Sequence, residues 1–325
     1  MIPTIYKLKF PNGIHIGGLS GIGLESTEFT MTSDALYSAI FCEYKKLFDD
    51  DELYTLVEKR EFLLSDLLPY KNQELYIPKP VVSIERKVQP SSEQRTDRKK
   101  LKSLSHIPLS KLRGYFAFLR TGEHLPEIDD DFGTKMLHTK NMISRTGDDT
   151  QLYNLEIFKF NKESGLYFIL DCPENFQAKF EQTLDSLSLS GLGGKRTLGY
   201  GQFRIDERIA LENNLQKPCE KQLVEMLNTD QNTHYLLLSG YLPQKEEVAL
   251  LKESQNWYRL IKRSGFVNHS SYSDEPQKRK QLHMICSGSV LGFKAQGRIA
   301  DLKLHGAHSI YRFGKPMILG VDLNG

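Results

Sequence analysis

The chain opens with an alternation of hydrophobic and basic residues. In residues 4–10, Tyr6, Leu8 and Phe10 alternate with Lys7 and Lys9. A period of two is typical of a β-strand with one face on the core. The pattern therefore predicts a first strand with one apolar face and one basic, solvent-facing side.

The spacing then changes to that of a helix. From Leu36 to Phe48 apolar residues recur every three or four positions, which predicts an amphipathic helix. Ser33 stands where an N-cap is expected, and Asp34 adds an acid to the first turn. This is the clearest helical pattern in the chain.

Further elements follow in the first two-thirds of the chain. The pattern predicts a hairpin (62–68 and 74–78), a short helix (128–137), a strand pair (153–160 and 166–172), a second long helix (176–187) and a strand that begins near Phe203. Without an insertion at about 84–150, the order is strand, helix, strand pair, helix, strand. That order is β-α-β-β-α-β, as in a ferredoxin-like fold.

A polar connection, residues 207–233, separates this part from the rest. Beyond it the pattern predicts a strand (234–242), a helix (245–261) and five strands (283–288, 289–293, 297–304, 309–313 and 317–323). We therefore predict an α+β protein of two ferredoxin-like (RRM-like) domains with antiparallel sheets. The first domain spans 1–206 and contains the insertion; the second, 207–325, is a degenerate copy because its second helix is missing.

Composition narrows the class of protein. The 325 residues suffice for two domains, and a net charge of only +2 means that any nucleic-acid surface must be local. The four cysteines stand far apart, which predicts reduced thiols and neither a zinc site nor disulfides. No run has the length of a signal peptide's apolar core or of a membrane span. We expect a soluble, cytoplasmic protein without a cofactor or metal.

The stretch 190–203 has the most unusual composition in the chain. It holds five glycines, the adjacent cations Lys195 and Arg196, and Tyr200. Glycine-rich loops bring backbone N–H groups close to an anion, and the cations would add charge. The spacing fits neither a Walker A loop nor a dinucleotide-binding fingerprint, and only a Gly-Tyr-Gly centre matches an RNA-recognition strand. A purely structural helix-to-strand turn is the alternative.

Four stretches together resemble a known family. They are residues 13–17 followed by 32–39, residues 140–147, residues 191–203, and residues 311–316. In this order they are similar to the RAMP superfamily of CRISPR effector proteins, in particular to its Cas-five-like group and the family of fourth Csm subunits of type III-A effector complexes.

The resemblance implies a non-catalytic RNA-binding subunit. It would bind the 5′ repeat-derived handle of the CRISPR RNA (crRNA) and contact both the large Cas-ten-type subunit and the backbone RAMP subunit, with target RNA nearby. The expected RNA contacts lie in the first loop (His15, Gly17, Gly18, Ser20, Gly21), the insertion (Asn141, Arg145) and the glycine-rich loop (Gly191, Gly193, Gly194, Lys195, Arg196, Thr197, Gly199, Tyr200, Gly201).

Two other functions stay open from the sequence. Some RAMP proteins cut RNA with a histidine, and His15 is the candidate base for a metal-independent endoribonuclease that processes CRISPR precursor RNA. No second acid or base is tied to His15 by spacing, which argues against it. The last alternative is an interaction protein that binds no RNA.

Overall fold

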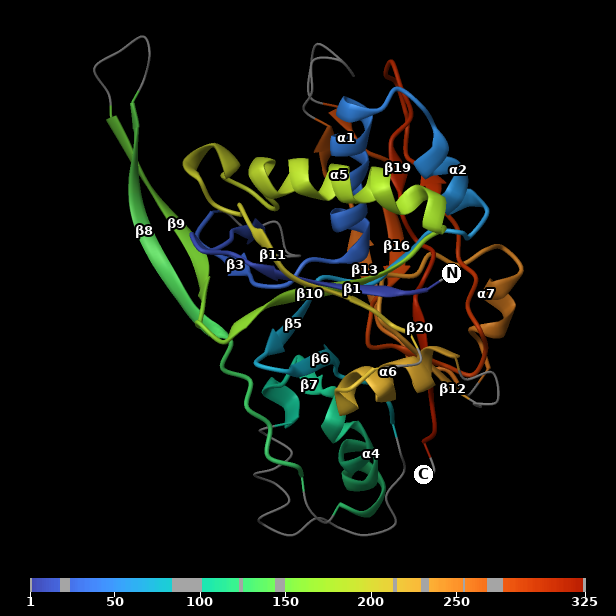
Figure 1. Ribbon diagram of the computed structural model, residues 1–325. Coiled ribbons are helices and arrows are strands. Elements are labelled where there is room, and N and C mark those ends of the chain that lie inside the picture. The colour runs from blue at the N-terminus through green and yellow to red at the C-terminus, as the bar shows by residue number, and fades with distance from the viewer. Residues whose placement is uncertain are drawn as a thin grey trace.

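The computed structural model describes residues 2–17, 24–83, 101–122, 125–143, 150–212, 215–228, 234–253, 255–267 and 277–323. Four predicted site residues lie outside these ranges: Gly18, Ser20, Gly21 and Arg145. Residues 84–100 of the predicted insertion lie outside them too. Figure 1 shows a central sheet with helices on both faces and one long two-stranded hairpin, β8–β9, that projects from the body.

The main sheet is built from strands that lie within the first 210 residues. Its strands run β11-β1-β10-β5-β6-β7, and β4 also pairs with β10. The bounds are β1 (Thr4–Lys9), β4 (Leu63–Leu64), β5 (Leu68–Lys71), β6 (Glu74–Pro78), β7 (His106–Pro108), β10 (Ser164–Asp171) and β11 (Arg204–Ala210). Helices α1 (Ser33–Leu47) and α5 (Glu174–Ser190) pack on one face of this sheet (Figure 1).

β1, β6, α1 and α5 form close to where the periodicity predicts them, whereas β7 has no counterpart in the prediction. The α1 and α5 stripes bury Leu36, Ile40, Phe176 and Phe180 against the β1 side chain Tyr6 and its neighbours. Every pair of named strands in the described ranges is antiparallel. The prediction of an α+β protein with antiparallel sheets is thus confirmed.

The predicted basic, solvent-facing side of the first strand is wrong. Lys7 is only 2% exposed and forms an ion pair with Glu207 on β11, with 2.7 Å between Nζ and Oε2. The reason is a second hydrophobic core beneath this face of the sheet. There Ile5 packs in one cluster with Leu236 and Leu319 from the last third of the chain.

The predicted short helix at 128–137 is also wrong. Residues of that segment belong to β8 (Gly133–Ile143), which pairs along its whole length with β9 (Thr150–Phe160). The predicted pairing of 153–160 with 166–172 fails for the same reason, because β9 pairs with β8 while β10 pairs with β1 and β5. Cross-strand pairing has overridden a local pattern that fits either structure.

Further helices in the described part of this region are short. They include α2 (Glu52–Glu58), the 3-10 turn η1 (Leu109–Lys111) and α4 (Leu112–Thr121). The small pair β2 (Ile16–Gly17) and β3 (Thr27–Glu28) joins the first loop to α1, and a second 3-10 turn, η2 (Arg196–Leu198), lies within the glycine-rich loop. The predicted hairpin of 62–68 with 74–78 is present in shifted form: β5 pairs with β6, and the turn is at Asn72 and Gln73. Leu63 and Leu64 form β4 instead, which pairs with β10.

The last third contains α6 (Pro218–Asn228) and a three-stranded sheet, β17-β12-β20. Its strands are β12 (His234–Leu237), β17 (Val290–Leu291) and β20 (Ile318–Val321). Two-stranded pairs are made by β13 (Leu260–Arg263) with β16 (Leu282–Ile285), β14 (Phe266–Val267) with β15 (Gln277–Lys278), and β18 (Ala300–Asp301) with β19 (Tyr311–Arg312).

The helix predicted at 245–261 is mostly absent. Only α7 (Glu247–Leu250) forms there. Trp257 instead donates its backbone N–H to the Val290 carbonyl, and Leu260 begins β13. The strand pairing of the last third has again replaced a helical pattern.

The domain boundary between residues 206 and 207 and the second ferredoxin-like domain both stay predictions. β11 continues through that boundary to Ala210. Residues from both sides of it share one hydrophobic cluster, since Ile5 and Tyr167 pack with Leu236 and Val290.

The four cysteines are free thiols that differ in burial. Cys172 and Cys219 are buried free thiols as expected, whereas Cys42 is exposed and Cys286 half-buried. Within the described ranges no group of three His, Cys, Asp or Glu side chains is arranged to hold a metal ion. Across those same residues, no helix has the length and hydropathy needed to span a bilayer.

Candidate nucleic-acid interface

Three segments that are distant in the sequence meet on one side of the main sheet. The Gly194 N–H donates to the His15 carbonyl at 2.7 Å, and the Gly201 N–H donates to the Gly13 carbonyl at 3.0 Å. The first loop is also bonded to the projecting hairpin, because the Ile14 N–H donates to the Phe158 carbonyl at 2.9 Å. We call this meeting of residues 13–17, β9 and residues 191–201 the glycine-loop junction.

Bare backbone is what allows the two loops to touch. A Cβ atom built on Gly193 would lie 2.3 Å from the His15 carbonyl oxygen, and the backbone of Gly193 has a φ of +86°. Contacts that short do not occur for real side chains, and positive φ costs other L-residues energy. Glycine at this position therefore sets the distance between the first loop and the glycine-rich loop.

Most of the glycine N–H groups are not free to bind an anion, contrary to the expectation from composition. Gly191 donates to the Leu187 carbonyl and Gly199 to the Arg196 carbonyl, and Gly194 and Gly201 donate as described above. The bonds of Gly191 and Gly199 stabilise the loop's own turns, and those of Gly194 and Gly201 attach it to the first loop. The glycines act mainly as packing and turn residues.

Three other N–H groups of the loop have no acceptor. In the described part of the chain, the backbone N–H groups of Lys195, Arg196 and Thr197 donate to no oxygen. They are consecutive, and they stand at the start of the η2 turn, where Lys195 adopts a left-handed conformation with φ of +56°. Successive N–H groups in such a turn form a concavity suited to an anion.

The two cations of the loop also lack partners. Within the described ranges neither Lys195 nor Arg196 forms an ion pair, and Arg196 and Thr197 are exposed. The Lys195 ammonium lies 4.9 Å from the ring centroid of Tyr153 on β9, a cation–π contact that leaves its charge uncancelled. By contrast, Lys179 on α5 lies 2.6 Å from Glu52 and 2.8 Å from Asp50. The loop therefore concentrates positive charge.

Tyr200 is a packing residue in this structure. Its ring is 9% exposed and lies in a small cluster with Leu155 and Ile157 of β9. The Lys140 ammonium lies 5.9 Å from its ring centroid. The ring anchors the glycine-rich loop on the hairpin, so it offers no open stacking face. Tyr153, which the sequence reasoning missed, is the half-buried ring beside the cations.

His15 is held inside the junction. Its side chain is 4% exposed, and its Nδ1 lies 2.7 Å from the backbone carbonyl of Glu156. A carbonyl only accepts, so Nδ1 carries the proton and donates. The other edge of the ring lies against Gly194, where a Cβ would stand 2.9 Å from Cδ2. This geometry fits a residue that positions the first loop on the hairpin.

The other predicted contacts are spread around the junction. Gly17 is exposed at the end of β2, and Asn141 is exposed on β8, opposite Leu152 in the register. Sequence reasoning missed Asn12, whose side chain donates to the Gly199 carbonyl at 3.2 Å. It also missed Glu156, which accepts from the Thr27 N–H at 2.8 Å. Neither had a signal in the sequence, because both depend on the unpredicted β8–β9 pairing or on loop contacts.

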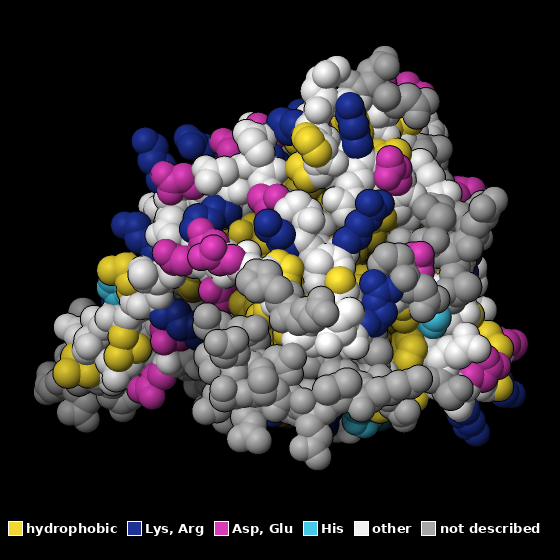
Figure 2. All heavy atoms as spheres, turned by 90° about the horizontal axis from the view of Figure 1, so that it is seen from below, with side chains coloured by type: hydrophobic (Ala, Val, Ile, Leu, Met, Phe, Trp, Pro, Cys, Tyr) yellow, Lys and Arg dark blue, Asp and Glu magenta, His cyan; other side chains and the backbone are white. Residues whose placement is uncertain are grey.

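The projecting hairpin carries exposed apolar side chains. Met136, Leu137 and Leu152 are 40%, 60% and 68% exposed. Figure 2 shows yellow side chains on this projection at the left of the view, while the neighbouring body presents cations and carboxylates side by side. The hairpin is thus apolar at positions where an isolated surface strand would be polar.

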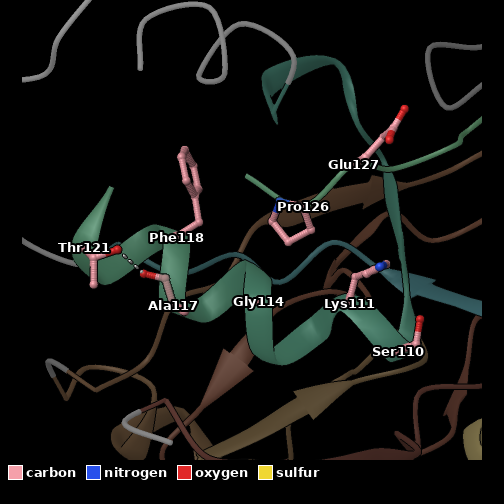
Figure 3. Close-up of a pocket in the computed structure, with 8 residues that line it drawn as sticks. All are labelled: Ser110, Lys111, Gly114, Ala117, Phe118, Thr121, Pro126 and Glu127. Atoms are coloured by element: carbon pink, nitrogen blue, oxygen red, sulfur yellow. Dashed lines mark hydrogen bonds between the residues drawn. The ribbon is translucent and has the colours of Figure 1, made fainter. Parts of the chain in front are cut away.

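A groove along α4 lies apart from the junction. It has a volume of about 590 Å³, and the ring of Pro126 closes over Gly114 in it (Figure 3). Lys111 and Glu127 are the two charged side chains in its lining. Such a lining lacks the converging polar groups of a catalytic site.

Comparison with known sequences agrees with this architecture. A sequence profile of the RAMP superfamily matches residues 45–204, and a profile of the CRISPR Csm4 C-terminal domain matches residues 230–321. The CRISPR system Cms protein Csm4 of Mycobacterium tuberculosis is 28% identical over 299 residues, covering 92% of this chain and 92% of that protein. The protein of the same name from Streptococcus thermophilus is 27% identical over 331 residues, covering 99% and 100%.

Solved structures show the same fold. The chain superposes on one described as the Csm3-Csm4 subcomplex in the type III-A CRISPR-Cas interference complex, with a TM-score of 0.62, 18% identity and coverage of 99% of this chain and 100% of that one. It also superposes on a Csm1-Csm4 cassette in complex with pppApA, with a TM-score of 0.59, 17% identity and coverage of 100% and 99%.

The sequence profiles define the class that this chain resembles, because residues 45–204 match the RAMP superfamily. The resemblance drawn from the four sequence stretches is therefore confirmed. Within that class the chain is similar over nearly its whole length to CRISPR proteins named Csm4.

Proposed function

We propose that this chain is the subunit of a type III-A Csm complex that binds the 5′ handle of the crRNA. The observation that carries the proposal is the set of unpaired donors in the glycine-loop junction: the Lys195 and Arg196 side chains and the backbone N–H groups of residues 195–197. Single-stranded RNA is bound through such cations and backbone donors on its phosphates.

Two partner subunits follow from the family. Relatives with this fold have been solved with Csm3 and with Csm1, and their descriptions name an interference complex and a cassette. We infer equivalent contacts here with the backbone RAMP subunit and the large Cas-ten-type subunit, with target RNA passing nearby. The exposed apolar residues Leu137 and Leu152 on the hairpin support contact with another molecule.

The subunit is proposed to be non-catalytic. A general base must reach the proton that it removes, whereas the His15 ring is enclosed between Glu156 and Gly194. Under the endoribonuclease alternative, His15→Gln would abolish precursor cleavage, although glutamine can still donate to the Glu156 carbonyl. We expect cells with this variant to produce mature crRNA at the normal level, measured by RNA blotting.

Binding of a labelled repeat-derived single strand across a salt series tests the RNA proposal. The Lys195→Ala, Arg196→Ala double variant should bind more weakly, with a log–log salt slope lower by about 1.4, since each lost phosphate contact on a single strand removes about 0.7. A Lys59→Ala, Lys221→Ala variant is the matched control, because it removes two exposed lysines away from the junction. Equal loss in both variants would contradict the proposal.

A further inference from the structure

The strands behind α1 in the last third form a second region of concentrated charge. Residues 259–267 pair with residues 277–285 through β13–β16 and β14–β15. These eighteen residues contain six lysines and arginines and no aspartate or glutamate, whereas the whole chain has 43 cations and 41 acids. We call this structure the basic ribbon.

The inner face of the basic ribbon is fixed to the body. Arg263 donates to the Thr32 hydroxyl at 2.6 Å and to Asp34 Oδ1 at 2.8 Å, just before and within the first turn of α1. Ile261 and Met284 pack with Leu242 in a small hydrophobic cluster. Figure 1 shows β13 and β16 next to α1. The ribbon is therefore a rigid platform and not a loose hairpin.

The outer face carries cations without partners. Lys262 and His283 stand opposite each other in the register and are exposed, and so is Lys278, which stands opposite Phe266. In the described part of the chain, no carboxylate pairs with Lys262, Lys278 or the exposed Lys280. Elsewhere exposed cations do find acids: Arg208, for example, contacts Glu181 at 3.2 Å.

An aromatic side chain lies among these cations. Phe266 is 61% exposed, although the burial of its ring would be favourable. Interleaved cations and exposed aromatic rings are the usual means of binding a single strand, because the cations contact phosphates and the ring stacks on a base. An acidic protein surface would match the charge but would give no role to the exposed ring.

The basic ribbon also borders the same helix as the glycine-loop junction. Ser190, directly before the glycine-rich loop, donates to Glu43 of α1 at 3.1 Å, and Arg263 of the ribbon contacts Asp34 in the first turn of the same helix. A strand that contacts the loop can therefore continue toward the ribbon.

We infer that the outer face of the basic ribbon, formed by Lys262, Phe266, Lys278, Lys280 and His283, is a second binding surface for single-stranded nucleic acid. It lies beside the glycine-loop junction across α1. The inference does not depend on handle binding by the glycine-rich loop, because the ribbon's own charge and exposed ring favour a single strand.

The test uses a labelled oligouridylate of about 16 nucleotides and the full chain. A ribbon variant, Lys262→Ala with Lys278→Ala and Lys280→Ala, should bind with a salt slope lower by about 2, for three lost phosphate contacts. The matched control removes three exposed lysines elsewhere, Lys59→Ala with Lys221→Ala and Lys252→Ala. It should bind like the wild type, because its net charge change is the same but lies off the ribbon.

The outcomes separate this inference from the proposed function. If the loop variant of Lys195 and Arg196 loses affinity while the ribbon variant binds like the wild type, the ribbon inference is overturned and handle binding by the loop stands. If only the ribbon variant loses affinity, the ribbon inference stands and handle binding by the loop is overturned. Equal loss in the ribbon variant and its control, or no binding by the wild type, overturns the inference.

A second readout reports on the ring itself. The chain has one tryptophan, so Trp257→Phe with Phe266→Trp places the only indole on the ribbon. Stacking of a base should quench its fluorescence on saturation with the strand. Phe266→Ala should weaken binding by roughly tenfold. Unchanged fluorescence with the strand bound would overturn the role of this face.

Discussion

The glycine-loop junction and the basic ribbon both present unpaired cations, yet they are attached to the body in opposite ways. The glycine-rich loop is held by backbone hydrogen bonds to the carbonyls of His15 and Gly13 and by packing of Tyr200, with no ion pair in this attachment among the described residues. The ribbon is held by ion pairs: Arg263, together with Arg312 of β19, contacts the buried carboxylate of Asp34. Close packing of backbone secures the first region, and electrostatics secures the second.

This difference determines what each region tolerates. A contact between bare backbones is insensitive to pH and salt but has no space for an added atom. A buried ion pair tolerates small changes of volume but not the loss of one partner, because the other charge then remains buried without compensation. Each of the following variants should therefore damage one region and spare the other.

The largest effect is expected from Asp34→Ala. Asp34 is 1% exposed, and Arg263 and Arg312 each have one buried Nε with no hydrogen-bond partner. Removing the carboxylate leaves two buried guanidinium groups without a counter-ion, which should reduce the free energy of unfolding by about 3–5 kcal/mol. Urea unfolding monitored by circular dichroism measures the loss.

Hydrogen exchange shows where the damage lies. In Asp34→Ala the amides of β13 should lose protection, while those of Gly194 and Gly201 keep theirs. The control is Asp129→Ala, which breaks the exposed 2.6 Å pair with Lys71 and should cost about 0–1 kcal/mol. Uniform loss of protection across both regions would show that they do not respond separately.

The next effect, about 2–5 kcal/mol, is expected from Gly193→Ala. The added Cβ would stand 2.3 Å from the His15 carbonyl oxygen at a left-handed φ. Left-handed backbone costs an L-residue about 1–2 kcal/mol and overpacking about 1–3 kcal/mol. Thermal unfolding should show the loss, and exchange protection should fall at Gly194 while β13 is unaffected.

Gly199→Ala isolates the conformational part of that cost. Its φ is +84°, but nothing lies within 4 Å of a Cβ built there. We expect a loss of only about 1–2 kcal/mol. An equal loss in Gly193→Ala and Gly199→Ala would mean that the approach to His15 does not contribute.

The sequence was sufficient for elements whose periodicity agrees with their packing. β1, α1 and α5 formed close to where the pattern predicts them. β8 did not, because its apolar residues also fit a helix, and only pairing with β9 decides between the two. The burial of Lys7 could not be predicted from the sequence either, because it depends on Glu207 and on a core shared with the last third of the chain.

The candidate site was predictable in location but not in chemistry. Composition identified 190–203 as the unusual loop. It could not show that four glycine N–H groups are used internally, because two of their acceptors lie in the first loop, on His15 and Gly13. The sequence showed the basic ribbon only as two separate runs of cations. The pairing that places Phe266 opposite Lys278 depends on the tertiary structure.

The pH dependence of the free energy of unfolding should also differ between the two regions. Asp66 accepts from the Ser33 N–H at 2.7 Å, at the start of α1 beside the ribbon's anchor. Burial is the main cause that raises the pKa of Asp66 to about 6, and the neighbouring Asp34 adds to it, while hydrogen bonds from Ser33 and Ser287 oppose it. No comparable carboxylate belongs to the attachment of the glycine-rich loop in the described residues.

The sign of the effect follows from proton binding. Between pH 4 and 6 the folded state holds the Asp66 proton more tightly than the unfolded chain, so this group's contribution to stability falls as pH rises through that window. His106 acts in the opposite direction, because burial lowers its pKa to about 4. The contribution of His106 is the same in the wild type and in Asp66→Asn, so it cancels when their free energies of unfolding are subtracted. The wild type should lose about 2 kcal/mol relative to Asp66→Asn from pH 4 to pH 7, measured by urea unfolding. A constant difference would show that Asp66 stays ionised, and exchange at Gly194 should be unaffected.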